Sequence, residues 1–486
     1  MSPSTGESLD VARPDDLDAA AILEVARGAD VELAPDLLTT LRGRRDEVLS
    51  ALAGGTPAYG VSTGMGALAD VELSSEEQTD HSARLMLARA VGGPPWLEPR
   101  ETRALLAVRL RTFLSGDAGV SADLCGWLAA LLVDGAVPAV PRTGSGAAGE
   151  IIPLAHAFGH LAGVGRWLGR APRVGPVALG PKEGLSLLQG TPVATALALL
   201  RADDVRRAAA LETRLAAAQV ALVGASRDPY APPLARGDRV LAGVLSELAA
   251  ALPPVTPTAP VRRLQAPVSF RVVGPVLAHL ARQATALDGA VDRALGGVTD
   301  SPAWLPEDGT FVGTAGFHGL DLAAGLDGLR VALAHTAAVG AARLHRMLDP
   351  VVSGLPAQLS SDPGPHGGLV AVHKRAAAAV HAVSGWASTP LGPVETSGGQ
   401  EDVQTFALEA AEKLRLTLGA AREVQACGLL AVHQARLLAP HLLADAPPPL
   451  ASLLDELAAV LPATTLDRPW GEDLQHLLDG PLLAGS

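Results

Sequence analysis

The chain has 486 residues, of which 48% are hydrophobic and only 3% aromatic, so it can bury a large core packed mainly by alanine, leucine and valine. The 38 lysines and arginines are outnumbered by 51 aspartates and glutamates, and the resulting formal charge of −13 would repel a phosphate backbone, which excludes nucleic acid as a partner. The acidic N-terminal residues do not read as a secretory signal, and no run reaches the ~18 uninterrupted apolar residues of a membrane span. With two cysteines and no expected membrane segment, we expect a cytoplasmic protein.

Two glycine-rich loops interrupt the N-terminal part of the chain. Residues 17–53 predict two short helices, after which glycines and a proline break the pattern in GGTPAYGVSTGMGA, residues 54–67. A second break, GAVPAVPRTGSGAAGE, covers residues 135–150. A helix is predicted to begin near Glu150, because Pro153 falls in its first turn, where a missing N–H is tolerated. Between the two loops, amphipathic segments are predicted at about 75–92, 100–115 and 120–134.

Long helices are predicted for the rest of the chain. From residue 183 onward apolar residues recur at spacings of three and four, which is typical of helices longer than the globular average. The fold class is therefore mainly α, a long-helix bundle with a loop-rich N-terminal region. Strand-like alternation is confined to VPAV at 137–140 and to residues 269–273. The predicted long helices cover about 183–224, 317–347 and 402–438. The expected regions are 1–180 with both loops, 181–440 with the central bundle, and 441–486 as a C-terminal helical tail.

Eight short motifs stand out along the chain. They are YGVSTGMG (59–66), GSGAAGEIIPLAH (144–156), PKEGLSLLQGT (181–191), QAPVSFR (265–271), DSP (300–302), GFHG (316–319), SGLP (353–356) and QED (400–402). In sequence and order they resemble the aromatic amino acid ammonia-lyase and aminomutase family, the group of the histidine and phenylalanine ammonia-lyases. The resemblance implies the family's ammonia-lyase fold, which is similar to that of fumarase and aspartase. It also implies a homotetramer in which three subunits build each active site.

The resemblance also concerns a prosthetic group. In the family an Ala-Ser-Gly tripeptide cyclises and loses water to form methylidene-imidazolone, an electrophile that captures the substrate, and the serine supplies the hydroxyl that leaves. The matching residues are Ala147, Ala148 and Gly149, in a loop one residue shorter than the family pattern, with Glu150 in place of the following aspartate. Because alanine has no hydroxyl to lose, the resemblance implies a member without this group, and we expect no cofactor.

The surviving family positions, together with the substituted positions Arg89 and Gln189, predict the site residues. Tyr59 matches the family's general base and Glu401 would complete an acid–base pair, so both are predicted to be catalytic. Arg271 presents a planar fork that can hold a substrate carboxylate through two hydrogen bonds. Arg89 could stabilise the Tyr59 phenolate or hold a second anionic group, and the backbone N–H groups of residues 148–150 offer an anion site. The other predicted binding residues are Gln265, Gln189, Phe317 and Gly66.

Each of these residues also has a purely structural interpretation. Arg271 could be an ion-pair partner, Tyr59 a packing residue and Arg89 a solvated side chain. Glu401 could cap the long helix predicted to follow it. Several family positions, most of them polar, carry other residues here, namely Ser62, Met65, Ala88, Arg89, Gln189, Ala266, Val268 and Gly316. His156 and His160 have the spacing of a metal-binding pair, but no third ligand is nearby, so no metal is expected.

The expected function is that of a lyase-like enzyme that lacks methylidene-imidazolone. It would act by acid–base chemistry on a small carboxylate-bearing substrate, with amino-acid derivatives as candidates, by elimination, isomerisation, or addition and cyclisation. Such reactions are typical of specialised metabolism. Two alternatives remain open. In the first, the chain is a catalytically silent homologue that binds a ligand or partner. In the second, it is a conventional ammonia-lyase whose prosthetic group forms from Gly144, Ser145 and Gly146.

Overall fold

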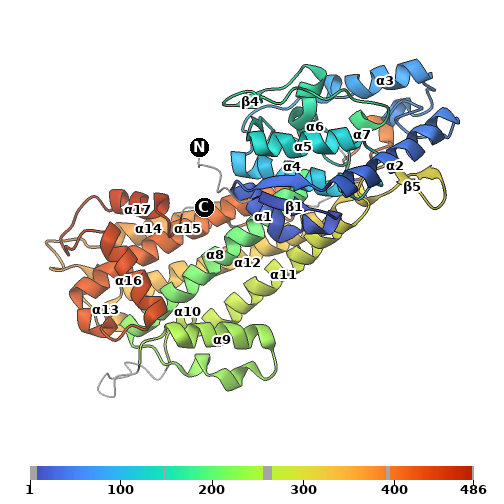
Figure 1. Ribbon diagram of the computed structural model, residues 1–486. Coiled ribbons are helices and arrows are strands. Elements are labelled where there is room, and N and C mark those ends of the chain that lie inside the picture. The colour runs from blue at the N-terminus through green and yellow to red at the C-terminus, as the bar shows by residue number, and fades with distance from the viewer. Residues whose placement is uncertain (1–7, 147, 255–264, 390–393, 484–486) are drawn as a thin grey trace. The chain divides into compact units, whose positions relative to one another are not determined.

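The computed structural model is mainly helical and describes residues 8–146, 148–254, 265–389 and 394–483 (Figure 1). The helices are α1 (Ala19–Arg27), α2 (Pro35–Ala53), α3 (Ser75–Arg84), α4 (Pro99–Leu114), α5 (Ala122–Asp134), α6 (Ile151–Phe158), α7 (Glu183–Leu188), α8 (Pro192–Val223), α9 (Arg239–Ala251), α10 (Val268–Arg271), α11 (Val273–Gly296), α12 (Leu320–Met347), α13 (Pro350–Ser353), α14 (Val370–Val383), α15 (Ala407–Leu438), α16 (Pro448–Val460) and α17 (Trp470–Asp479). The strands are β1 (Ser8–Val11), β2 (Asp30–Leu33), β3 (Val137–Pro138), β4 (Trp167–Leu168), β5 (Ala303–Leu305) and β6 (Thr310–Val312), which pair as β1–β2, β3–β4 and β5–β6.

The chain divides into two compact units that do not follow sequence order. Unit 1 combines residues 1–201, 287–327 and 388–412, and unit 2 combines 202–286, 328–387 and 413–486. The long helices α8, α11, α12 and α15 each contribute residues to both units. All motifs of the two glycine-rich loops, together with GFHG and QED, belong to unit 1.

The N-terminal helices of unit 1 form its packed base. α1 packs on α4, α4 packs on α5, and the parallel pair β1–β2 lies against α5. Asp18 caps α1 by accepting a hydrogen bond from the Ala21 N–H, and Gly28 ends the helix in the left-handed conformation, as expected for these residue types. The two short helices predicted within residues 17–53 are thereby confirmed.

A buried ion pair fixes the short helix α7. Lys182, which is only 1% exposed, directs its Nζ to the carboxylate of Asp300 at 2.5 Å and donates to the Ala118 carbonyl oxygen and to Ser186 Oγ. Burial raises the pKa of nearby Asp117 to about 6, and the charge of Asp300 adds to the shift. The pair holds the start of α7, and so the entry into α8, on the body of unit 1.

Unit 2 is held by a second set of buried polar contacts. The Arg343 guanidinium on α12 pairs with the Glu212 carboxylate on α8 and donates to the Gln219 side-chain oxygen. Gln425 on α15 donates to the same glutamate and to the Ala208 carbonyl oxygen. Long helices with apolar stripes are thereby tied together at fixed positions.

Several sequence expectations change in the structure. Residues 268–271 form the helical turn α10, so the strand expected at 269–273 is wrong. The helix predicted over 183–224 is two helices separated at Gly190, which has a φ of +78° that favours glycine. The helix expected from residue 402 begins only at Ala407. The helix expected near Glu150 begins at Ile151, and a strand does occur at 137–138, so both of these predictions are confirmed.

Two helical stretches reach the length and mean hydropathy of a membrane span. These are Glu183–Val223 and Gly316–Met347, each with a mean hydropathy of 1.2 over its most apolar window. Of the residues in those windows, 94% and 61% are buried within the protein. Core helices of a helical protein meet the same criterion. The 94% burial of the first stretch is typical of a core helix.

Candidate functional site

The first glycine-rich loop folds back on itself through Tyr59. The Tyr59 phenol oxygen accepts a hydrogen bond from the Gly66 backbone N–H at 2.7 Å. Gly66 has a φ of +60°, and a Cβ at this position would lie 3.6 Å from the Ser397 side chain, because the loop packs on residues 397–399. The loop therefore brings the tyrosine hydroxyl to the segment that carries the QED motif.

Arg89 completes this cluster. It ends a short 3-10 helix after α3, and it donates to the Leu85 carbonyl oxygen at 3.1 Å. Burial lowers the pKa of its guanidinium, while the nearby Tyr59 and Glu401 favour the charged form and oppose that shift. Arg89 is half-buried near two predicted catalytic groups, so the structure does not place it as a fully solvated side chain.

Glu401 belongs to a hydrogen-bonded chain. Its Oε2 accepts from the Thr396 hydroxyl at 2.8 Å, and the backbones of these two residues pair as an isolated β-bridge. The Thr396 hydroxyl in turn accepts from Gln404 Nε2 at 3.2 Å. Because α15 begins six residues after Glu401, the interpretation of Glu401 as a helix cap is wrong.

His81 lies near the same cluster, and the sequence analysis missed it. It belongs to α3, its Nε2 is buried without a hydrogen-bond partner among the described residues, and burial followed by the charge of Arg89 lowers its pKa. It therefore stays neutral at pH 7 and can act as a proton acceptor. None of the family motifs covers this position, so only its place on the exposed amphipathic helix α3 could have drawn attention to it.

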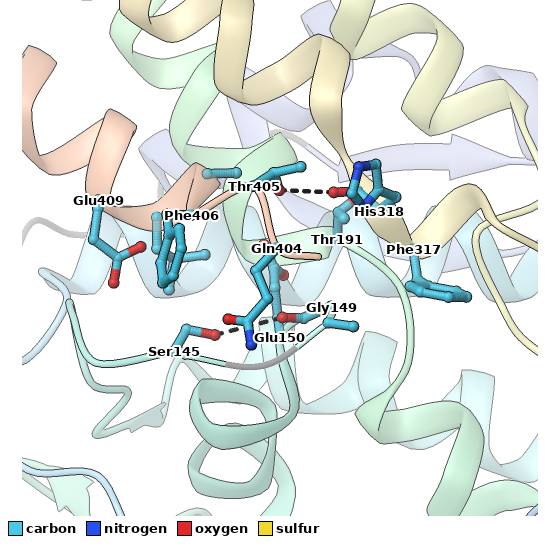
Figure 2. A pocket seen from close by; sticks show the side chains of 13 residues that line it. Ser145, Gly149, Glu150, Thr191, Phe317, His318, Gln404, Thr405, Phe406 and Glu409 are labelled. Carbon is cyan, nitrogen blue, oxygen red and sulfur yellow. Dashed lines mark hydrogen bonds between the residues drawn. The ribbon is translucent and has the colours of Figure 1, made fainter. Parts of the chain in front are cut away.

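A pocket that Gln404 helps to line lies between the second glycine-rich loop and the start of α15 (Figure 2). Its cavity volume is about 20 Å³, and it is lined by Ser145, Ala148, Gly149, Glu150, Thr191, Phe317, His318, Gln404, Thr405, Phe406, Ala407, Leu408 and Glu409. The Thr405 hydroxyl donates to the His318 carbonyl oxygen at 2.7 Å, and Ser145 Oγ donates to that of Gly149 at 3.5 Å. This volume has room for about one water molecule.

Glu150 fixes the second loop to the start of α8. Its two carboxylate oxygens accept from the backbone N–H groups of Val193 and Ala194, each at 2.6 Å, which are among the N–H groups that the first turn of a helix leaves unpaired. Burial raises the pKa of Glu150 to about 8, and the charge of Glu409 adds to this, whereas the two N–H groups and Arg109 oppose it. Glu150 is thus a structural anchor in the wall of the pocket.

The residues in the second loop do not fit the family's prosthetic group. Ala148 lines the pocket where the family serine would stand, and its methyl side chain has no hydroxyl to eliminate. Ala147 lies outside the described residues. Ser145 is buried in the same pocket, and its hydroxyl is directed to the Gly149 carbonyl oxygen.

The predicted carboxylate-binding residues belong to the other unit. Arg271, at the end of α10, is half-buried, its Nε is unpartnered, and its side chain makes no hydrogen bond or ion pair with the described residues. An ion-pair role for Arg271 is therefore not supported. Gln265 is exposed just before α10. In unit 1, Phe317 lines the pocket, and the Gln189 carbonyl oxygen accepts from buried Arg109 at the end of α7.

The two histidines with metal-ligand spacing point to different partners. His156 on α6 accepts a hydrogen bond from the Gly92 N–H at 2.9 Å through Nε2. His160 lies on the following 3-10 helix between the rings of Trp127 and Trp167. Within the described part of the chain, no group of three or more potential ligands is close enough to hold a metal ion.

Comparison with known proteins identifies the family. The family defined as aromatic amino acid lyase matches residues 17–458. The histidine ammonia-lyase of Symbiobacterium thermophilum is 30% identical over 95% of each chain. The chain therefore belongs to the aromatic amino acid lyase family. Among solved structures, a tyrosine aminomutase from Streptomyces globisporus superimposes with a TM-score of 0.88, covering 97% of this chain and 96% of that one at 23% identity.

A second solved structure with this fold is also similar to the chain. The ergothioneine-degrading enzyme of Treponema denticola superimposes with a TM-score of 0.86 at 19% identity, covering 97% and 98% of the two chains. At such identities the structural likeness shows the ammonia-lyase fold alone. Membership in the aromatic amino acid lyase family and the mainly helical ammonia-lyase fold, both expected from the motifs, are confirmed.

Proposed function

We propose that this member of the aromatic amino acid lyase family is an enzyme that works without methylidene-imidazolone. The proposal is supported by two features that occur together in this chain. Ala148 has no hydroxyl at the serine position, and Tyr59, Arg89 and Glu401 form a cluster. A protein that had only lost activity would have no need to bring a tyrosine, an arginine and a glutamate together. The proposed reaction is elimination, isomerisation, or addition and cyclisation on a small carboxylate-bearing, amino-acid-derived substrate.

The proposed roles follow from the chemistry of each side chain. Tyr59 serves as the base that removes a proton, with the Arg89 guanidinium nearby, and Glu401 transfers a proton to or from the leaving or accepting group. Arg271 holds the substrate carboxylate, with Gln265 beside it in the sequence, as residues that a neighbouring copy in the proposed homotetramer supplies. Gln189, Phe317 and Gly66 are the further binding residues. Positioned acid–base groups supply about 10²–10⁴-fold, which is too little for an unactivated β-carbon. The substrate must therefore carry an acidic proton or a good leaving group.

Intact mass and a substrate panel test the proposal together. The purified chain should have the mass of its sequence, because cyclisation with dehydration would make it lighter by two water molecules. The panel contains histidine, phenylalanine and tyrosine, together with amino acids that carry a leaving group on the β-carbon. Turnover is expected only for the activated substrates, and it should be lost in Y59F.

Conventional histidine deamination is the second candidate. It is favoured by the histidine ammonia-lyase from Symbiobacterium thermophilum, with its 30% identity over 95% of each chain. It would require a relocated prosthetic group, for which Ser145 offers a hydroxyl. Rapid formation of urocanate together with a mass deficit of two waters would establish it and overturn our proposal. A native mass without turnover of any panel member would instead favour the silent homologue.

The assembly and location are part of the same proposal. A homotetramer would cover apolar helix surface and complete the site with residues of neighbouring copies. The two cysteines, Cys125 and Cys427, are free and buried, which is in keeping with a reducing compartment such as the cytoplasm. Light scattering of the purified protein gives the number of copies directly.

A further inference from the structure

A short turn fixes the backbone of Glu401. Thr396 and Glu401 close this turn through two backbone hydrogen bonds, one from the Thr396 N–H to the Glu401 carbonyl oxygen at 2.9 Å and one in the opposite direction at 3.4 Å. Between them Ser397, Gly398 and Gly399 have φ values of +56°, +66° and +88°, which glycine adopts readily and serine rarely. The turn therefore has a specific backbone conformation that places Thr396 directly opposite Glu401.

The Thr396 side chain fixes the carboxylate as well. Residues directly opposite each other in an antiparallel pair point to the same face, and the Thr396 hydroxyl donates to Glu401 Oε2 at 2.8 Å. Glu401 Oε1 makes no hydrogen bond or ion pair with the residues that the structure describes. Because a glutamate side chain has three rotatable bonds, the backbone turn alone would leave the carboxylate free to reorient.

Gln404 sets the direction of this hydrogen bond. Its Nε2 donates to the Val394 carbonyl oxygen at 3.2 Å, and because a carbonyl oxygen only accepts, this contact fixes which end of the amide faces Thr396. The same Nε2 donates to the Thr396 hydroxyl oxygen at 3.2 Å. The single hydrogen of the hydroxyl is then directed to Glu401. Gln404 is only 5% exposed, so water competes little for its amide.

We infer that Thr396 is a positioning residue, which holds Glu401 Oε2 as a hydrogen-bond acceptor and leaves Oε1 for the proton that the reaction transfers. The inference rests on the proposed function, in which Glu401 exchanges that proton. Arg89 lies near Glu401 but forms no ion pair with it, so Thr396 is the group that orients this carboxylate within the described part of the chain. Thr396 precedes the QED motif and belongs to none of the eight motifs.

The variant T396V tests the positioning role, because valine has the shape of threonine but no hydroxyl. We expect kcat to fall about 10–10²-fold and KM to change less than about threefold, since a misplaced proton-transfer group slows the reaction without loosening substrate binding. T396S keeps the hydroxyl and should recover most of the lost kcat. T417V is the matched control, because Thr417 is buried on α15, belongs to unit 2 and donates only to the Lys413 carbonyl oxygen, so its kcat should be native.

A stability cycle tests the same contact without turnover. T396V should lower the midpoint of urea unfolding in the native chain and lower it much less in E401L, because leucine offers the hydroxyl no acceptor. In E401Q the amide oxygen still accepts from Thr396, so T396V should again lower the midpoint. E401Q cannot carry the proton, however, and should lose kcat while keeping this contact.

The two measurements separate this inference from the proposed function. Equal midpoint shifts for T396V in the native and E401L chains would overturn the positioning role, whether or not a substrate is converted. A native kcat in T396V, or a loss that T396S does not recover, would overturn it in an active enzyme. Coupling in the cycle without turnover of any panel member would instead contradict the proposed function and reduce Thr396 to a structural contact. If T396V does not fold, T396A removes the same hydroxyl and serves in both measurements.

Discussion

The Tyr59 phenol oxygen accepts its hydrogen bond from the Gly66 backbone N–H, seven residues along the same loop. This contact leaves the phenol hydrogen free for other partners and fixes the oxygen near Arg89 and Glu401. The Y59F variant removes the oxygen and keeps the ring. We expect kcat to fall about 10²–10⁴-fold, the usual contribution of a positioned acid or base.

The same variant should change stability little, because a partly buried hydrogen bond contributes about 1 kcal/mol. Urea unfolding of Y59F and of the native protein measures this on the same preparations. A variant that keeps native kcat would rule out Tyr59 as the base, whereas a large loss of stability would make it a packing residue.

Tyr230 is predicted to position Arg271 within unit 2. Its hydroxyl donates to the carbonyl oxygen of Phe270, the residue before Arg271, and burial raises the pKa of this phenol to about 12. Y230F leaves that carbonyl oxygen without its donor, and should raise KM for the carboxylate substrate several-fold while changing kcat less. Because this buried carbonyl oxygen loses its donor, Y230F should lower the free energy of unfolding by about 1–3 kcal/mol.

An alkaline titration followed by tyrosinate absorbance checks the Tyr230 variant independently. The chain has only two tyrosines, so the step near pH 12 should vanish in Y230F. If Y230F changes KM and kcat only as much as its loss of stability explains, Tyr230 has no specific role in positioning Arg271.

The motifs contain the residues of the proposed acid–base cluster but not most residues of the pocket at the start of α15. Tyr59 and Glu401 occur in motifs whose spacing the family fixes, so their positions could be inferred from a sequence. Gln404 and Glu409 line this pocket because α15 begins at Ala407, which leaves residues 402–406 outside any regular element. The start of a helix inside an unbroken apolar pattern depends on tertiary contacts that periodicity does not contain.

The strand-like interpretation of residues 269–273 failed for a related reason. β-Branched and aromatic residues there favour a strand, but no neighbouring strand exists for them to pair with in the described parts of unit 2. Pro267 opens a helical turn instead, and the Tyr230 hydroxyl takes up the Phe270 carbonyl oxygen. The parallel pair β1–β2 was missed because its strands have only four residues each and join across the helix α1.

Glu150 should make stability depend on pH. Its pKa is about 8 in the folded chain against an ordinary 4.5, since burial and Glu409 on α15 outweigh the favourable Arg109 on α4 and the N–H groups that open α8. The folded state therefore holds the proton more tightly. Its contribution is complete below pH 4.5 and is lost as pH rises toward 8, at no more than about 1.4 kcal/mol per pH unit.

The E150Q variant isolates this dependence, because glutamine keeps the length of the side chain but does not titrate. The free energy of unfolding of the native protein minus that of E150Q should fall between pH 5 and about 8 and become constant above it. Urea unfolding at four pH values in this range measures the difference. Parallel curves for the two proteins would show that Glu150 titrates in the folded state as it does in the unfolded one.

Replacing Lys182 alone in the buried pair Lys182–Asp300 should destabilise the protein strongly, whereas replacing both residues should destabilise it much less. K182M leaves the Asp300 carboxylate buried without its cation, beside Asp117, whose pKa burial and Asp300 already raise to about 6. We expect K182M to lower the free energy of unfolding by about 3–5 kcal/mol, and K182M/D300N to recover much of this loss. R84M is the control, because the exposed Arg84–Asp80 pair contributes about 0.2–1 kcal/mol. Equal losses in K182M and R84M would mean that the buried pair is solvated and does not anchor α7.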